Sequence, residues 1–352
     1  MNNDITYTKA VGILLMVLCH SMFWDIPIVY MFHMPLFFFF SGYCLKEKYL
    51  GEPHQFIFRK IKGIWLPYIK YSVLFLLLHN VMYSLNIYNS NYGFKGQTSS
   101  IYSQGDVLNH LSEILMRMQG QEQLLGGYWF LRALFFGSLM AFFMIFFVAM
   151  ISKILKFSYS CCILCGGAIL IVGCLMLNYF NRTISVLAID VTCLMSAVFF
   201  WVGHVFATFK MPKFSKMKML ISIFLLIMGS FLCPLKMGLV HFQIWKIMPY
   251  MITAVLGTWC VYSLPWNQLD KRMTDFLRFV GMRTLPILTW HFLSFKLVSL
   301  LIIMIYGLPI ERLAEFPVIQ EYTCQGWFIL YFVVGILVPL YISKIQIKWE
   351  RF

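Results

Sequence analysis

The chain has 352 residues and a formal net charge of +14; 61% of its residues are hydrophobic and only 12% are charged. A typical soluble domain has about 45–50% apolar and about 25% charged residues, so this composition excludes an ordinary soluble domain. The positive charge would fit a nucleic-acid partner, but its distribution along the chain, described below, argues against one.

Apolar runs of roughly 20 residues recur along the whole chain, and each is long enough to cross a hydrocarbon core of about 30 Å. We predict ten membrane-spanning helices, at about residues 7–25, 28–45, 64–86, 128–150, 159–178, 184–207, 218–235, 245–264, 284–306 and 325–343. The first residues, MNNDITYTK, carry an acid before any base and precede no small-residue cleavage site, so we expect the first span to be retained. The prediction is an all-α integral membrane protein, a single polytopic domain over residues 1–352 without a separate soluble domain.

The basic residues gather in alternate loops. With ten spans both termini lie on one side, and that side collects most of the 28 Lys and Arg residues, including the groups at 46–62, 210–218 and 271–283. Cytoplasmic loops carry such an excess of Lys and Arg. We therefore predict cytoplasmic termini, a multi-pass protein of the cell (inner) membrane and no nucleic-acid partner.

The cysteines and the longest loop bear on possible sites. Most of the ten cysteines lie within spans, and the CxxC at Cys162 and Cys165 has no matching second pair, so we predict no metal site. The outer loop, about residues 87–127, is too long for a mere connection. It is either a lid or acceptor surface, or a disordered outer loop.

The first span contains KAVGILLMVLCH, in which Lys9 and His20 are eleven positions apart. Eleven steps make about three helical turns, so the two side chains share a face and lie roughly 16 Å apart. A cation at one end and a titratable base at the other suit a long ligand that is anionic at its head and reactive at its tip, as coenzyme A thioesters are. Alternatively, Lys9 is only a snorkelling anchor.

The second span reads VYMFHMPLFFFFSGYCL. His33 lies at its outer start, where it is either catalytic or an interfacial residue bonded to backbone. Pro35 is expected to tilt the helix, and Ser41 and Gly42 either line the site or serve helix packing, since small residues let membrane helices approach closely.

Five segments follow one another along the chain: KAVGILLMVLCHS, VYMFHMPLFFFFSGYCLK, FIFRKIKGIWLPY, YWFLRALFF and GMRTLPILTWH. Together they resemble the type 3 membrane acyltransferase family, and more narrowly its fucose 4-O-acetylase-like branch. The family's first-span Arg, separated by ten residues from a His, corresponds to Lys9 before His20. Its basic pair corresponds to Arg59 and Lys62, and its late His to His291.

The resemblance implies a membrane-embedded O-acyltransferase that moves an acetyl (acyl) group from acetyl-CoA to a sugar hydroxyl of a cell-surface or lipid-linked glycan. His20 would be the base or a transient acyl carrier, because a hydroxyl needs a base within hydrogen-bond reach as it attacks a thioester. Lys9, Arg59 and Lys62 would bind the donor. The expected partners are acetyl-CoA as co-substrate, the saccharide acceptor and membrane lipid, with no permanently bound cofactor.

The fourth span opens with Trp129 and Arg132, which we expect to bind the acceptor. The indole would stack on a sugar ring, and the guanidinium would bind an acceptor phosphate or the developing oxyanion. Relatives carry a carboxylate five residues after this Trp, where the chain has Leu134. The remaining candidate acid is Asp190, which we expect within the sixth span with a catalytic role.

Lys296 lies near the middle of the ninth span, where a lone cation is costly. We expect it to pair with Asp190 or to line a hydrated cavity, with His291 also lining the site. A transporter or flippase of a lipid-linked glycan, with Lys70, Asp190 and Lys296 along its path, is the alternative function. The shared face of Lys9 and His20 and the ordered motifs favour the enzyme.

Overall fold

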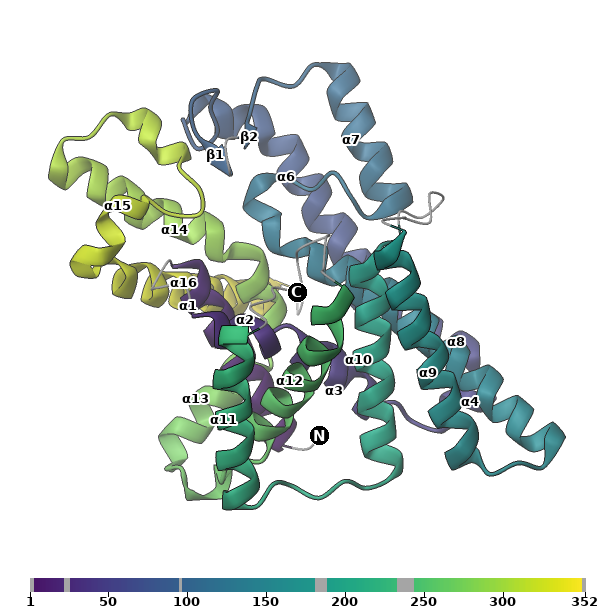
Figure 1. The fold of residues 1–352 in the computed structure, drawn as a ribbon. Helices are drawn as coiled ribbons and strands as arrows, with labels where there is room; N and C mark the ends of the chain where they lie inside the picture. Colours follow the sequence, from purple (N-terminus) through teal and green to yellow (C-terminus); the bar gives the residue numbers. More distant parts are fainter. Residues whose placement is uncertain (1–2, 22–25, 95–96, 181–188, 233–243, 350–352) are drawn as a thin grey trace. The chain divides into compact units, whose positions relative to one another are not determined.

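The computed structural model describes residues 3–21, 26–94, 97–180, 189–232 and 244–349, and this part of the chain is almost entirely α-helical (Figure 1). Seven helical segments within it are long and apolar enough to cross a membrane: Pro53–Ser84, Gln123–Leu155, Tyr159–Tyr179, Val191–Thr208, Trp245–Gln268, Thr284–Tyr306 and Gln320–Ile345. The all-α membrane fold is therefore confirmed, while the count of ten spans is not.

The chain forms two compact units, each built from segments that are distant in sequence. Unit 1 comprises Met1–Thr8, Pro27–Pro67 and Trp129–Leu269, and unit 2 comprises Lys9–Ile26, Tyr68–Tyr128 and Asp270–Phe352. Helix α1 (Asn3–His20) contributes its first residues to unit 1 and the remainder to unit 2.

In unit 1, helix α10 (Val191–Thr208) packs against α3, α8 and α9 (Figure 1). The elements of this unit are α2 (Pro27–Phe32), α3 (Pro35–Tyr43), α4 (Lys48–Gly51), α5 (Pro53–Lys60), the π-helical turn η1 (Ile61–Trp65), α8 (Trp129–Leu155), α9 (Tyr159–Tyr179), α11 (Lys216–Leu232), α12 (Ile244–Tyr262) and the 3₁₀ turn η3 (Trp266–Gln268). The interior is aromatic, with the Phe39, Trp259 and Tyr262 rings packed together.

Two glycines set the distance between α3 and α10. A Cβ at Gly42 of α3 would overlap the carbonyl oxygen of Phe200, and a Cβ at Gly203 of α10 would overlap the carbonyl oxygen of Phe39. The two backbones therefore touch directly, as small residues allow in membrane helix pairs. The packing role predicted for Gly42 agrees with this contact.

The second predicted span is not one helix. α2 ends at Phe32 and α3 begins at Pro35, with His33 and Met34 between them. Pro35 has no N–H to donate and so cannot continue the helical bonds of α2, and the chain restarts with proline at the first helical position. The expected continuous helix over residues 28–45 was wrong, because proline breaks it rather than tilting it.

The third predicted span is longer than expected. It starts at α5, passes through η1 and continues as α6 (Leu66–Ser84). A π-helical turn holds an extra residue and so changes which side chains share a face, and such turns are frequent at functional sites.

In unit 2, helix α14 (Thr284–Tyr306) packs against α16 and against η2. The other elements of this unit are the strands β1 (Gly93–Phe94) and β2 (Gln97–Thr98), the helices α7 (Gln104–Arg117), α13 (Lys271–Gly281), α15 (Gln320–Tyr322) and α16 (Phe328–Trp349), the 3₁₀ turns η2 (Gln123–Tyr128) and η4 (Ile310–Ala314), and the π turn η5 (Thr323–Trp327). Gly127 of η2 lies close against Leu288, and the Tyr128 hydroxyl is 2.7 Å from the Thr289 hydroxyl.

The described part of the outer loop is folded, so the disordered alternative was wrong for it. Ser103 caps α7 and forms a capping box with Asp106, in which both residues bond each other's backbone N–H. The buried His79 of α6 lies 2.8 Å from the Glu122 carboxylate and donates from Nε2 to the Ser100 carbonyl. These bonds attach the loop to α6.

Candidate active site

His20 and His291 form a pair in unit 2. His20 is the last residue of α1, and its Nδ1 lies 2.9 Å from Nε2 of His291 in α14. The two rings are nearly parallel, with an interplanar angle of 14°. His291 is fully buried, whereas His20 is half-buried. The sequence analysis predicted only that His291 lines the site. In the structure, His291 is hydrogen-bonded directly to the predicted base, His20.

Backbone bonds determine where the protons of this pair reside. His291 Nδ1 lies 3.0 Å from the carbonyl oxygens of both Ile287 and Leu288. Carbonyl oxygens only accept, so Nδ1 carries the hydrogen and Nε2 of neutral His291 carries the lone pair. His20 Nδ1 then donates to that lone pair, and the basic lone pair of His20 resides on Nε2. A second histidine thus orients the His20 imidazole.

Aromatic residues pack against this pair. The Phe292 ring lies 4.8 Å from the His20 ring and 3.9 Å from the His291 ring, measured between centroids. The Phe316 ring packs against Phe292 at a tilt of 51°, with 4.5 Å between the ring centroids, and Gly126 of η2 lies next to both phenylalanines. The imidazoles therefore have an apolar face.

Lys9 lies in the same helix as His20, and α1 is continuous between them. The predicted shared face and the spacing of roughly 16 Å therefore hold along one helix. Lys9 is half-buried and its role as a donor ligand stays a prediction.

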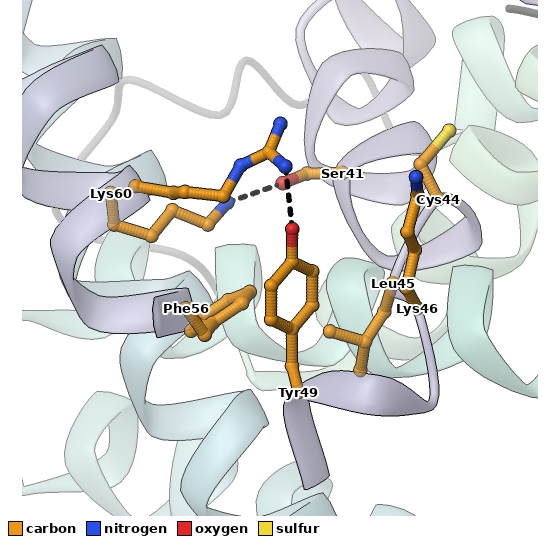
Figure 2. Close-up of a pocket in the computed structure, with 8 residues that line it drawn as sticks. Ser41, Cys44, Leu45, Lys46, Tyr49, Phe56 and Lys60 are labelled. Carbon is orange, nitrogen blue, oxygen red and sulfur yellow. Dashed lines mark hydrogen bonds between the residues drawn. The ribbon is translucent and has the colours of Figure 1, made fainter. Parts of the chain in front are cut away.

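Unit 1 contains a basic pocket of about 450 Å³, including the open space at its mouth. Figure 2 shows its lining: Ser41, Cys44, Leu45, Lys46, Tyr49, Phe56, Arg59 and Lys60. Lys46, Arg59 and Lys60 bring three cations, and no carboxylate is present among these lining residues. The arrangement favours an anionic ligand.

Side-chain bonds hold two of the three cations in place (Figure 2). Arg59 Nη1 donates to the Tyr49 hydroxyl at 2.6 Å, and Lys60 Nζ donates to the Ser41 hydroxyl at 2.7 Å. The Lys60 ammonium also lies over the Phe56 ring, 5.1 Å from its centroid. Ser41 is thus a lining residue of the pocket.

The sequence interpretation selected Arg59 and Lys62 as the donor-binding pair, and only Arg59 lines the pocket. Lys62 is exposed and Lys60 lines the pocket, so the donor-binding role of Lys62 stays a prediction. The helix becomes π-helical at Ile61, between Lys60 and Lys62. The adjacent basic residues of the run RKIK were the available signal for Lys60.

Asp190 lies at the start of α10 rather than inside a span. Its carboxylate accepts from the Cys193 backbone N–H at 3.0 Å, as an N-cap does, and from Arg132 Nη1 at 3.2 Å. Both side chains of this ion pair are largely buried. The expectation of an acid within the sixth helix was wrong, because the helix begins at Val191, after this residue.

Lys296 and Asp190 each have partners within their own unit. The buried Lys296 ammonium donates to the backbone carbonyls of Leu313 at 2.9 Å and Glu315 at 2.6 Å. The predicted pairing was wrong, because carbonyl oxygens of unit 2 satisfy this cation.

His33 and Trp129 both lie in unit 1. The buried His33 donates from Nδ1 to the Val29 carbonyl at 2.8 Å, which is the backbone-bonded alternative for this residue. Trp129 is the first residue of α8 and is half-buried, with its ring edge-on to Phe130. The roles of both residues in catalysis or acceptor binding stay predictions.

Comparison with known proteins identifies the family. The family model described as an acyltransferase domain matches residues 2–345, nearly the whole chain. No curated protein and no solved structure matches the chain. The resemblance to type 3 membrane acyltransferases is confirmed, while the fucose 4-O-acetylase-like branch stays a prediction. The chain therefore belongs to the type 3 acyltransferase family, and it is a multi-pass membrane acyltransferase.

Proposed function

We propose that the protein transfers an acetyl group from acetyl-CoA to a sugar hydroxyl of a cell-surface or lipid-linked glycan at the cell membrane, with His20 as the general base. The bond between His20 and His291 carries this proposal, since it leaves the basic lone pair of His20 on Nε2. A neutral imidazole with a fixed tautomer is suited to take a proton at neutral pH.

The basic pocket of unit 1 is the proposed site for the phosphates of coenzyme A. Lys46, Arg59 and Lys60 supply charge-assisted donors, and such bonds to phosphate are stronger than neutral ones. Arg59 already points its guanidinium into the pocket through the bond to Tyr49. Lysine at position 9 keeps the charge of the family's Arg but not its bidentate fork, so binding would depend more on Arg59.

These residues account for every bond and proton of the transfer step. The acceptor hydroxyl attacks the thioester carbonyl while His20 Nε2 takes its proton, and His291 accepts the bond from His20 Nδ1 throughout. The tetrahedral intermediate then loses the C–S bond. The coenzyme A thiolate leaves and takes the proton back from the His20 imidazolium. Trp129 and Arg132 remain the proposed residues for the acceptor.

The test of the base is His20→Ala, compared with His54→Ala, which removes an exposed histidine outside the proposed site. Acetyl transfer to glycan acceptors and release of free coenzyme A thiol are measured on purified protein. His20→Ala should abolish transfer without loss of insertion, because the change makes the span more apolar. Substantial transfer by His20→Ala would remove His20 from the mechanism. An acetyl group trapped on the wild-type His20 after acid quenching would make it a transient carrier instead of a base.

The donor pocket has its own test, which does not require the acceptor. Cys44 is an exposed thiol that lines the pocket, and Cys324 is an exposed thiol of unit 2. Coenzyme A should slow alkylation of Cys44 and leave Cys324 unaffected, as followed by mass spectrometry. Equal alkylation rates of Cys44 with and without coenzyme A would place the donor elsewhere.

The transporter alternative loses its basis in the structure. Two of the three residues assigned to its path have other partners, since Asp190 binds Arg132 and Lys296 binds backbone carbonyls. Lys70 is exposed on α6. The family match favours the enzyme as well.

A further inference from the structure

Lys296 attaches the segment after α14 to α14 itself. Lys296 is 4% exposed, and its ammonium bonds to two carbonyl oxygens, those of Leu313 in η4 and of Glu315 just after it. A lysine within a membrane span is costly unless its ammonium is satisfied, so both bonds are needed for this residue to stay buried. Residues 313–315 are therefore held against α14.

This attachment places Phe316, the next residue, on Phe292. The two ring centroids are 4.5 Å apart, and the Lys296 ammonium lies 5.8 Å from the Phe316 centroid. Phe292 and Lys296 are four residues apart in α14, so they share one face of the helix. Lys296, Phe316 and Phe292 form one packed group.

Phe292 also packs against His20. The rings of Phe292 and His20 are 4.8 Å apart with an interplanar angle of 27°. His20 is the last residue of α1, so the helix backbone restrains it from one side only. Side-chain contacts with His291 and Phe292 thus contribute strongly to the direction of its ring.

We propose that Lys296 is a positioning residue for catalysis: by fixing residues 313–316 it presses Phe316 onto Phe292 and so holds the His20 imidazole in the reactive orientation. The proposal rests on the proposed function of His20 as base. It assigns Lys296 no contact with substrate.

The experiment compares Lys296→Met, Lys296→Arg and Phe316→Ala in the purified full-length protein. Lys296→Met and Phe316→Ala should each lower kcat on the order of 10–100-fold, because small misplacements of a catalytic group cost that much. Coenzyme A affinity, measured by calorimetry, should not change. Lys296→Arg should recover most of kcat, since a guanidinium can also donate to two carbonyls. Lys70→Met, which removes an exposed lysine of the same unit, is the control.

The double variant Lys296→Met with Phe316→Ala should be no slower than either single variant, because both changes act through one contact. If the double variant instead lost kcat by the product of the two single losses, the proposal would be overturned. A wild-type kcat in Phe316→Ala would also overturn it, because this variant leaves the buried bonds of Lys296 intact. If His20→Ala is inactive while Lys296→Met and Phe316→Ala have wild-type kcat, only the positioning role fails. An active His20→Ala variant would refute the proposed function instead.

Discussion

Replacing His291 tests whether a second histidine orients the base. His291→Leu removes the acceptor for the His20 Nδ1 proton, while His291→Gln offers an amide oxygen at a similar reach. The carbonyls of Ile287 and Leu288 also accept helical backbone bonds in α14, so neither variant leaves them without a donor. The fold should therefore persist, and the effect should appear in the chemical step.

The magnitude follows from the single bond that is lost. A neutral hydrogen bond contributes about 1 kcal/mol, which is roughly a fivefold change in rate. Without His291, the His20 imidazole is no longer held in one tautomer, which lowers the rate further. In serine proteases the wrong tautomer of the catalytic histidine costs up to about 10⁴-fold in rate. We expect His291→Leu to lower kcat on the order of 10–100-fold and His291→Gln to retain most of it, as measured by thiol release under saturating acetyl-CoA. Equal rates for the two variants would refute the orienting role of His291.

Three further predictions concern other parts of the molecule. Arg59→Ala should weaken coenzyme A binding about tenfold, as measured by calorimetry, because it removes one charge-assisted bond. Lys62→Ala should leave binding unchanged, because Arg59 lines the pocket and Lys62 does not; equal losses of affinity would contradict this assignment. Asp190→Ala should cost about 3–5 kcal/mol of stability, since it leaves a buried guanidinium unpaired, and an unchanged melting temperature in detergent would show that the ion pair is dispensable. The bonds from Ser103 lower the pKa of Asp106, so the capping box stabilises α7 above the ordinary carboxyl range and loses this contribution as the pH falls through the lowered pKa. Ser103→Ala removes the hydroxyl bond and keeps the backbone N–H bond, so it should raise that pKa in an NMR titration; an unchanged value would exclude the hydroxyl bond as a cause.

Local sequence was sufficient for most of the long helices and for the shared face of Lys9 and His20. The apolar runs predicted the long helices, and the continuous α1 keeps Lys9 and His20 on one face as periodicity indicated. The bond between His20 and His291 joins positions 271 residues apart, so spacing along the chain could not predict it. The resemblance gave both histidines but not their contact.

The errors came from backbone irregularities. Proline at position 35 was expected to tilt a helix, yet it separates two helices. Asp190 was assigned to a helix interior on hydropathy, while its carboxylate acts as a cap. In each case a local hydrogen-bond requirement overrode the hydrophobic pattern.

The contact between α3 and α10 limits which substitutions the chain can accept in these two helices. No side chain larger than hydrogen fits at Gly42 or Gly203, because each position faces a carbonyl of the other helix. Neighbouring phenylalanines of α3 can be exchanged for other large apolar residues at modest cost. A homologue that had lost its activity but kept its fold should therefore still carry the glycine next to Ser41. The Ser-Gly signature would then report that two helices meet, and it would be a poor criterion for deciding which members of the family are enzymes.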